Sequence, residues 1–143
     1  RGEGMDNQLI DAYHQTEYRV LLGEKSFNLT IGQYCQALKG LFDDEGVRSA
    51  TFITAWNPRS QLCDENQNKQ RQRTLKAELC RKGFRVIPGF GEDPSGKWPG
   101  EESIFVLGID KSSAIAVGYQ YEQNAIVYIG EDIIPRLVLI EFE

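Results

Sequence analysis

Apolar residues recur at helical spacing in several stretches of the chain, with polar residues between them. Between residues 31 and 42 the apolar positions are mostly three or four residues apart, which is typical of an amphipathic helix with one buried face. Thr30 is a candidate N-cap of this helix, and Gly46 lies just beyond its expected end. The same criteria predict helices at residues 7–15, 31–42, 64–82 and 112–121.

Short runs of apolar and β-branched residues between these helices predict strands. The clearest run is residues 51–56, which carries charge on neither face and therefore predicts a central strand covered on both sides. Pro58 cannot donate a hydrogen bond to a neighbouring strand and so ends this one. Further strands are expected at residues 18–22, 84–88, 103–109, 125–129 and 136–140, with a loop or a long hairpin connection at residues 89–100.

The order of these elements predicts the fold class. It is α-β-α-β-α-β-β-α-β-β, which favours an α/β (α+β) domain with a single mixed β-sheet and helices packed on it. The 143 residues are enough for one domain and leave little room for a second core. We place that domain at residues 5–143, beginning at Met5, and interpret residues 1–4 as a remnant of cloning.

The composition and charge exclude several classes of protein. With 41% apolar and 26% charged residues, the chain is not of the disordered type. Its net charge of −5 repels polyanions at long range, so binding to nucleic acid or to an anionic membrane is disfavoured. No apolar run approaches the roughly 18 residues that a membrane span needs, and no signal peptide is visible. We therefore expect a cytoplasmic protein.

The cysteines and the histidine narrow the chemistry further. Cys35, Cys63 and Cys80 are odd in number and lack a metal-binding spacing, which indicates reduced thiols in an intracellular protein. His14 is the single histidine of the chain, so no histidine cluster can bind zinc. The sequence predicts neither a metal site nor a cofactor.

The polar run that follows the central strand is the first candidate site. Trp56, Asn57 and Ser60 connect that strand with the helix predicted at residues 64–82. In α/β sheets ligands bind beyond the carboxyl ends of strands, and a helix amino terminus attracts anions. A phosphate or carboxylate is therefore the expected ligand here, and a turn that merely ends the strand is the alternative.

The helix predicted at residues 64–82 carries a second candidate. Its amino-terminal half contains no apolar residue, and at about 100° per residue Asn66 and Arg73 lie on one face. Ala77 and Cys80 continue this face, so we expect it to turn toward the interior. A solvated face with an ordinary surface arginine is the alternative.

Two further polar pairs lie at the ends of predicted strands. One of the adjacent carboxylates Glu101 and Glu102 must face the core if the strand alternates from its start. That carboxylate is expected to pair with Arg73 or to act as a general base. A charged strand entrance in water is the alternative. Gln123 and Asn124 lie between a helix and a strand, where they form either a C-cap or a pair of ligand-binding amides.

These positions occur in segments that together resemble one known family. The segments are residues 12–13, 16, 18–20, 31–32, 52–58, 65–66, 73, 75, 98–103, 106–108 and 123–127. In this order, and over nearly the whole chain, they resemble the bacterial domain-of-unknown-function family 3293. The resemblance implies no accepted activity. It favours Glu101 over Glu102, because the usual glutamate of the family precedes a serine by two positions. The polar positions that it implies are Asn57, Asn66, Arg73, Glu101, Ser103, Gln123 and Asn124.

The leading hypothesis is a small cytoplasmic domain with a polar pocket that binds a small polar or anionic, nucleotide-like ligand. If the domain is an enzyme, Glu101 and Arg73 are the predicted catalytic residues. The predicted ligand-binding residues, which include two tryptophans as aromatic walls, are Trp56, Asn57, Ser60, Asn66, Trp98, Ser103, Gln123 and Asn124.

Two other classes of function remain open at the level of sequence. A protein-binding or regulatory module suits the net charge of −5, because such a surface attracts a basic partner. A metal-independent hydrolase or nuclease is the other alternative, although the net charge and the single histidine count against a nuclease.

Overall fold

The computed structural model describes residues 7–142, and the predicted remnant at residues 1–4 lies outside this part together with Met5. The helices are α1 (Asn7–Gln15), α2 (Gln36–Glu45), α3 (Glu65–Arg81) and α4 (Lys111–Gln120). The strands are β1 (Glu17–Val20), β2 (Phe27–Leu29), β3 (Ala50–Ile53), β4 (Arg85–Glu92), β5 (Glu101–Leu107), β6 (Ala125–Ile129) and β7 (Arg136–Leu139). None of the helices in this part is long and apolar enough to cross a membrane.

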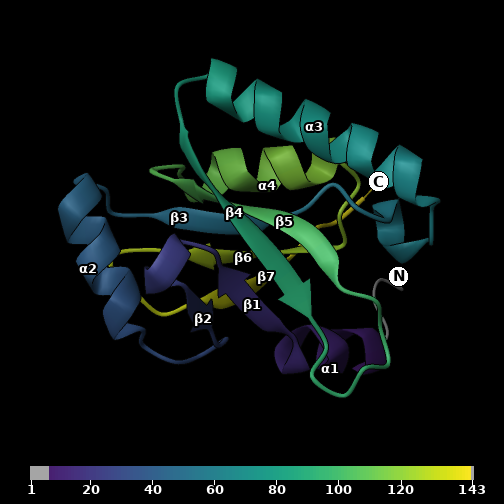
Figure 1. Ribbon diagram of the computed structural model, residues 1–143, viewed down its shortest axis with the longest axis horizontal. Helices are drawn as coiled ribbons and strands as arrows, with labels where there is room; N and C mark the ends of the chain where they lie inside the picture. The colour runs from purple at the N-terminus through teal and green to yellow at the C-terminus, as the bar shows by residue number, and fades with distance from the viewer. Residues whose placement is uncertain (1–6, 143) are drawn as a thin grey trace.

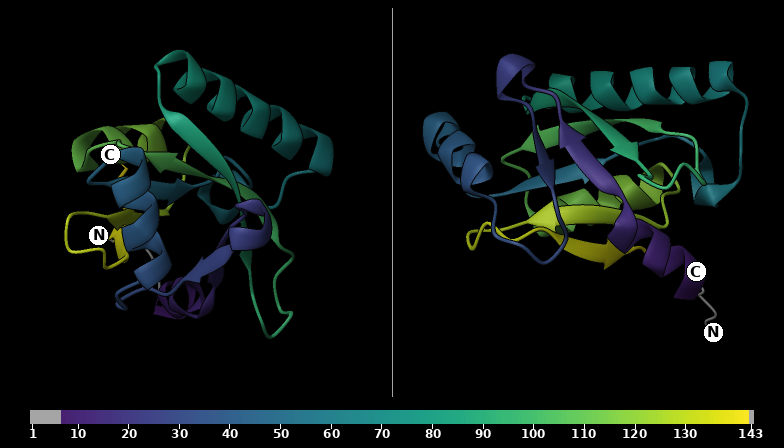
Figure 2. Two further views of the ribbon diagram at one scale, coloured as in Figure 1. Left: turned by 60° about the vertical axis from the view of Figure 1, so that its left-hand side comes forward. Right: turned by 60° about the horizontal axis from the view of Figure 1, so that its bottom comes forward.

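The strands form one curled sheet in the order β2-β1-β4-β5-β3-β6-β7 (Figures 1 and 2). This confirms the predicted α+β class and the single sheet with helices packed on it. The sheet is not mixed, however, because every strand pairing among residues 7–142 is antiparallel. The reason is that the α3 and α4 crossovers each skip one strand. The α3 crossover leads from β3 to β4 with β5 between them, and the α4 crossover leads from β5 to β6 with β3 between them.

The second helix starts later than predicted. Cys35 has an extended backbone and precedes α2, so Thr30 is not its N-cap. The backbone N–H groups of Gly32 and Cys35 donate to carbonyls in the β6–β7 loop, which holds this segment in a turn rather than a helix. The end of the helix is as predicted, since Gly46 adopts the left-handed conformation with φ of 68°.

Two strands differ from the sequence pattern. The pattern does not reveal β2, because a strand of three residues is too short to show a period of two. The loop predicted at residues 89–100 is shorter in the structure, because β4 continues to Glu92 and pairs with β1 and β5 through Gly89 and Gly91.

The two faces of the sheet bury separate apolar clusters. In β5, Phe105 and Leu107 belong to the cluster of the inner face, which α2 covers at one end. Ile104 and Val106 alternate with them and belong to the outer cluster, which packs against Leu75 of α3 and against α4. Since α2 covers one end of the inner face and α1 lies at the other end (Figure 1), the inner face near α1 is left for the site.

Candidate functional site

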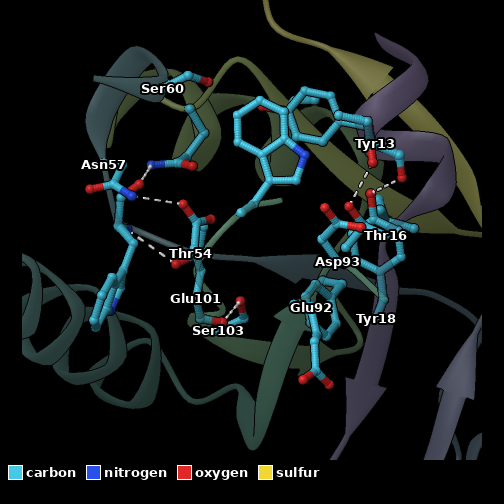
Figure 3. Close-up of a pocket in the computed structure, with 18 of the residues that line it drawn as sticks. Tyr13, Thr16, Tyr18, Thr54, Asn57, Ser60, Glu92, Asp93, Glu101 and Ser103 are labelled. Atoms are coloured by element: carbon cyan, nitrogen blue, oxygen red, sulfur yellow. Dashed lines mark hydrogen bonds between the residues drawn. The ribbon is translucent and has the colours of Figure 1, made fainter. Parts of the chain in front are cut away.

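A cavity of about 500 Å³ lies on the inner face of the sheet, next to α1. Its apolar lining includes Phe52, Val127, Leu137 and Trp98. Figure 3 shows the polar residues on two sides, with Asn57 and Ser60 on one side and residues of α1 and β1 on the other. The hydroxyl, amide and carboxylate side chains that line the cavity include Tyr13, Thr16, Tyr18, Thr54, Asn57, Ser60, Glu101, Ser103 and Gln123.

A glycine in β4 explains why there is room for a cavity on the inner face of the sheet. Gly91 pairs with Tyr18 on one side and with Glu101 on the other, so all three lie in one row across the sheet. A Cβ atom on Gly91 would have no neighbour closer than 3.8 Å, whereas one on Gly89 would lie 2.8 Å from a ring carbon of Phe52. The Phe52 ring therefore fills the space above Gly89, and the space above Gly91 remains open beside Glu101.

The Glu101 carboxylate is oriented by two buried asparagines, which we call the amide relay. Asn57 donates from Nδ2 to Glu101 Oε2 at 2.9 Å. The Asn57 Oδ1 atom accepts from the Cys63 backbone N–H at 3.0 Å and from Asn68 Nδ2 at 2.9 Å. Asn68 Oδ1 in turn accepts from the Asn57 backbone N–H at 2.8 Å. Because a backbone N–H is always a donor, both amides have one orientation, and Asn57 must donate to Glu101.

Burial dominates the electrostatics of the acid and the nearby phenols. It raises the pKa of Glu101, and the hydrogen bond from Asn57 opposes this effect. Burial also raises the pKa of Tyr13; the Ser60 hydroxyl opposes it, and the charge of Glu101 adds to it. Burial is also the largest reason why the pKa of Tyr18 is raised, and Tyr13 and Glu101 raise it further by smaller amounts. The phenols and the carboxyl are therefore close enough to influence one another.

The turn after β3 places its side chains through an uncommon backbone conformation. Asn57, Arg59 and Ser60 have φ of 47°, 53° and 61°, in the left-handed region that most residues avoid. Hydrogen bonds with the segment after α4 help to hold the turn in this conformation. The Arg59 N–H donates to the Glu122 carbonyl at 2.6 Å, and Asn124 Nδ2 donates to Ser60 Oγ at 2.9 Å.

The structure brings most of the predicted site residues to one place. Those that line the cavity are Trp56, Asn57, Ser60, Trp98, Glu101, Ser103 and Gln123. Asn124 lies behind Ser60, to which it donates. Glu101 faces the cavity and Glu102 is exposed, in agreement with the alternation predicted for this strand.

Asn66 and Arg73 lie elsewhere, because the predicted inward face of α3 was wrong. Both residues are exposed, as are Ala77 and Cys80 on the same face. Arg73 donates to the side chain of Gln70 at 2.7 Å and makes no ion pair with Glu101.

The buried face of α3 carries polar residues that sequence reasoning missed. Asn68 and Gln72 are 2% and 3% exposed, and they continue the spacing of Leu75 and Leu79 toward the start of the helix. Gln72 Oε1 accepts from the backbone N–H of Ala55 at 2.8 Å. The signal was present in the sequence, because positions 68, 72, 75 and 79 repeat at intervals of four, three and four.

Sequence reasoning also did not identify Arg71 as a support of the site, or the hydroxyl groups of α1 and β1 as part of its lining. Arg71 donates to the backbone carbonyls of Ala55 and Tyr121, and so ties the end of β3 to the end of α4. Tyr13 and Tyr18 line the cavity, although only the family resemblance had drawn attention to their segment. No group of three or more metal-ligating side chains occurs in the part of the chain that the structure describes.

Comparison with known proteins identifies a family but no characterised relative. Residues 53–126 match the model of a family described as "Protein of unknown function (DUF3293)". No curated protein and no solved structure matches the chain. The matched segment contains the amide relay and Glu101, and it covers just over half of the 143 residues. The chain therefore belongs to the DUF3293 family, as the sequence resemblance had indicated.

Proposed function

We propose that this domain binds a small organic molecule in the cavity of the inner face, with Glu101 as its polar anchor. The observation that supports this most strongly is the state of the Glu101 carboxylate. Its Oε2 atom accepts from the amide relay, whereas Oε1 accepts no hydrogen bond from any described residue. A carboxylate that is oriented on one oxygen and open on the other, at the wall of a cavity, is suited to hold a ligand.

The size and lining of the cavity favour a small molecule over a macromolecule. Its volume of about 500 Å³ lies in the usual range for small-molecule sites. Phe52, Val127 and Leu137 offer apolar surface that a ligand body can cover. Trp98 is 49% exposed and also lines the cavity, which supports its expected role as an aromatic wall.

The anionic form of the ligand, which the sequence suggested, has lost its main support. That hypothesis relied on the amino terminus of the predicted helix, but no residue of α3 lines the cavity, and Arg73 lies on the exposed face of this helix. We therefore keep the small polar ligand in the proposal and omit the phosphate or carboxylate.

Acid–base catalysis is a second candidate function of the same site. Burial raises the pKa of the Glu101 carboxyl, which brings it toward the range useful for proton transfer near neutral pH. Glu101 would be the general base, and Asn57 would position it. Arg73 has no part in this version of the site.

The proposal is tested by filling the cavity. Gly91→Leu places a side chain in the open space beside Glu101, and Gly40→Leu, at an exposed glycine of α2 with open space around it, is the matched control. A library of small metabolites is screened by thermal shift and by ligand-observed NMR against the unmodified chain and both variants. We expect ligands that bind the unmodified chain and Gly40→Leu but not Gly91→Leu. Binding that is equal in all three proteins, or no binding at all, would contradict the proposal.

A further inference from the structure

We infer that the ligand of this cavity carries a protonated nitrogen, such as an amine or amidine, on an apolar body. This inference rests on the function proposed above and adds the chemical class of the ligand. It is based on the charges around Glu101 and on the direction of the hydrogen bonds in the lining.

Glu101 lacks a cationic partner among the described residues. Among residues 7–142, no lysine, arginine or histidine forms an ion pair with it. A partly buried carboxylate without a counter-charge is costly, and a cation supplied by a ligand would remove that cost. An anionic ligand in the same cavity would instead be repelled.

The other charged groups of the lining are engaged or exposed. Glu92 is close to Arg19, with an N–O distance of 3.9 Å. The Asp93 carboxylate accepts hydrogen bonds from Ser95 and from the Lys97 backbone N–H, which holds the β4–β5 loop. Lys97 is the one cationic residue of the described lining and is exposed in that loop. Glu101 is therefore the acid of the cavity wall without an ion pair or loop contacts, and Glu92 and Asp93 add negative charge that Lys97 offsets only in part.

Four hydroxyls of the lining have also used their protons. Thr16, Tyr18, Thr54 and Ser103 each donate to a backbone carbonyl. Their oxygens can offer only lone pairs to a ligand.

The two amides of the lining also direct donors to acceptors of the protein. Asn57 donates to Glu101, and Gln123 donates to the carbonyls of Trp56 and Tyr121. Together with Glu101 Oε1, these groups make a surface that is rich in acceptors. A group with several N–H donors and a positive charge satisfies such a surface best.

Three probes of similar size and different charge test the inference. They are 2-phenylethylamine, 2-phenylethanol and phenylacetate, each titrated at pH 7.5 into the unmodified chain and followed by ¹H–¹⁵N NMR. We expect the amine to bind about tenfold or more tightly than the alcohol, and the carboxylate to bind most weakly. If the alcohol or the carboxylate binds as tightly as the amine, the inference is wrong. This comparison needs no variant and is independent of how a variant folds.

Glu101→Gln and Glu102→Gln then locate the effect. Glu102 is the adjacent carboxylate, exposed and absent from the cavity lining, so it is the matched control. We expect Glu101→Gln to remove the preference for the amine and Glu102→Gln to preserve it within about twofold. An equal loss in both variants would contradict the role of Glu101.

The two proposals fail in different ways. If 2-phenylethanol binds the unmodified chain but not Gly91→Leu, the cavity is a binding site and only the inferred ligand charge is wrong. If no probe binds more tightly to the unmodified chain than to Gly91→Leu, the inferred ligand charge is wrong. If the metabolite screen also finds no ligand of the cavity, the proposed function is wrong as well.

Discussion

Two backbone N–H groups, those of Asn57 and Cys63, determine how the Glu101 carboxylate is held. They set the orientation of the amide relay, and the relay then presents an N–H to the acid. Asn68 is the more deeply buried of the two asparagines and is 2% exposed. Its loss would leave the Asn57 N–H buried without an acceptor.

Asn68→Ala is therefore expected to lower the free energy of unfolding by about 1–3 kcal/mol, the usual cost of an unpaired buried polar group. Asn66→Ala, on the exposed face of the same helix, should change it by less than about 0.5 kcal/mol. Urea denaturation followed by tryptophan fluorescence measures both values. Equal losses in the two variants would show that the relay is not a buried network.

The raised pKa of Glu101 makes a second prediction, about pH. Because burial raises its pKa above the usual 4.5, the unfolded chain ionises at lower pH than the folded chain. The contribution of Glu101 to stability is therefore fully present below pH 4.5 and is lost as pH rises through the folded-state pKa. Glu101→Gln cannot ionise and should gain stability relative to the unmodified chain between pH 4 and pH 7.

Urea denaturation at both pH values measures this difference. The exposed Glu102→Gln variant serves as the control, since its side chain is in water in both states. A Glu101→Gln difference that is the same at both pH values would show that the carboxyl is not held in a poorly solvated place.

At the level of the elements, two glycines of β4 determine where a side chain fits on the inner face of the sheet. In β4, the neighbours of Gly89 and Gly91 differ although both glycines lie on the inner face. The first is covered by Phe52 and by the backbone carbonyl of Arg19, and the second faces open space. The strand therefore tolerates a side chain at one position and not at the other.

Gly89→Ala is expected to cost about 1–3 kcal/mol of stability, because its Cβ would lie 2.8 Å from the Phe52 ring and 3.1 Å from the Arg19 carbonyl oxygen. Gly91→Ala should cost less than about 0.5 kcal/mol. Thermal and urea denaturation of the two variants, side by side, test the difference. If both cost the same, the ring does not occupy the space above Gly89.

The elements themselves were largely predictable, and their faces were less so. The capping pattern of Asp64 with Gln67 and the spacing of Leu75 and Leu79 predict α3, and Asp64 does accept from the Gln67 N–H. Its inward face was assigned wrongly, because the buried residues at its start are polar. Asn68 forms hydrogen bonds with Asn57 in the turn after β3. The spacing of hydrophobic residues does not reveal that this turn needs a polar partner on α3.

For the molecule as a whole, the sequence predicted a single sheet with helices but not the direction of its strands. A helix between two strands suggests parallel neighbours, and here an antiparallel strand lies between the two strands that α3 connects and between the two that α4 connects. Part of the candidate site could be predicted because its polar residues lie at the ends of predicted strands, where they stand out from the apolar pattern. These residues are Asn57, Glu101, Ser103 and Gln123. The glycine that leaves room for the cavity, Gly91, carries no such signal in the sequence.

The family match ends before one wall of the cavity is complete. Residues 53–126 hold Asn57, Asn68 and Glu101, whereas Tyr13 and Leu137, on opposite ends of the chain, lie outside the match. Substitutions in these outer segments would change the shape of the cavity while leaving Glu101 and the amide relay as they are. If the proposed ligand binds there, such changes would alter which apolar body fits, whereas the acceptor for its polar end would stay the same.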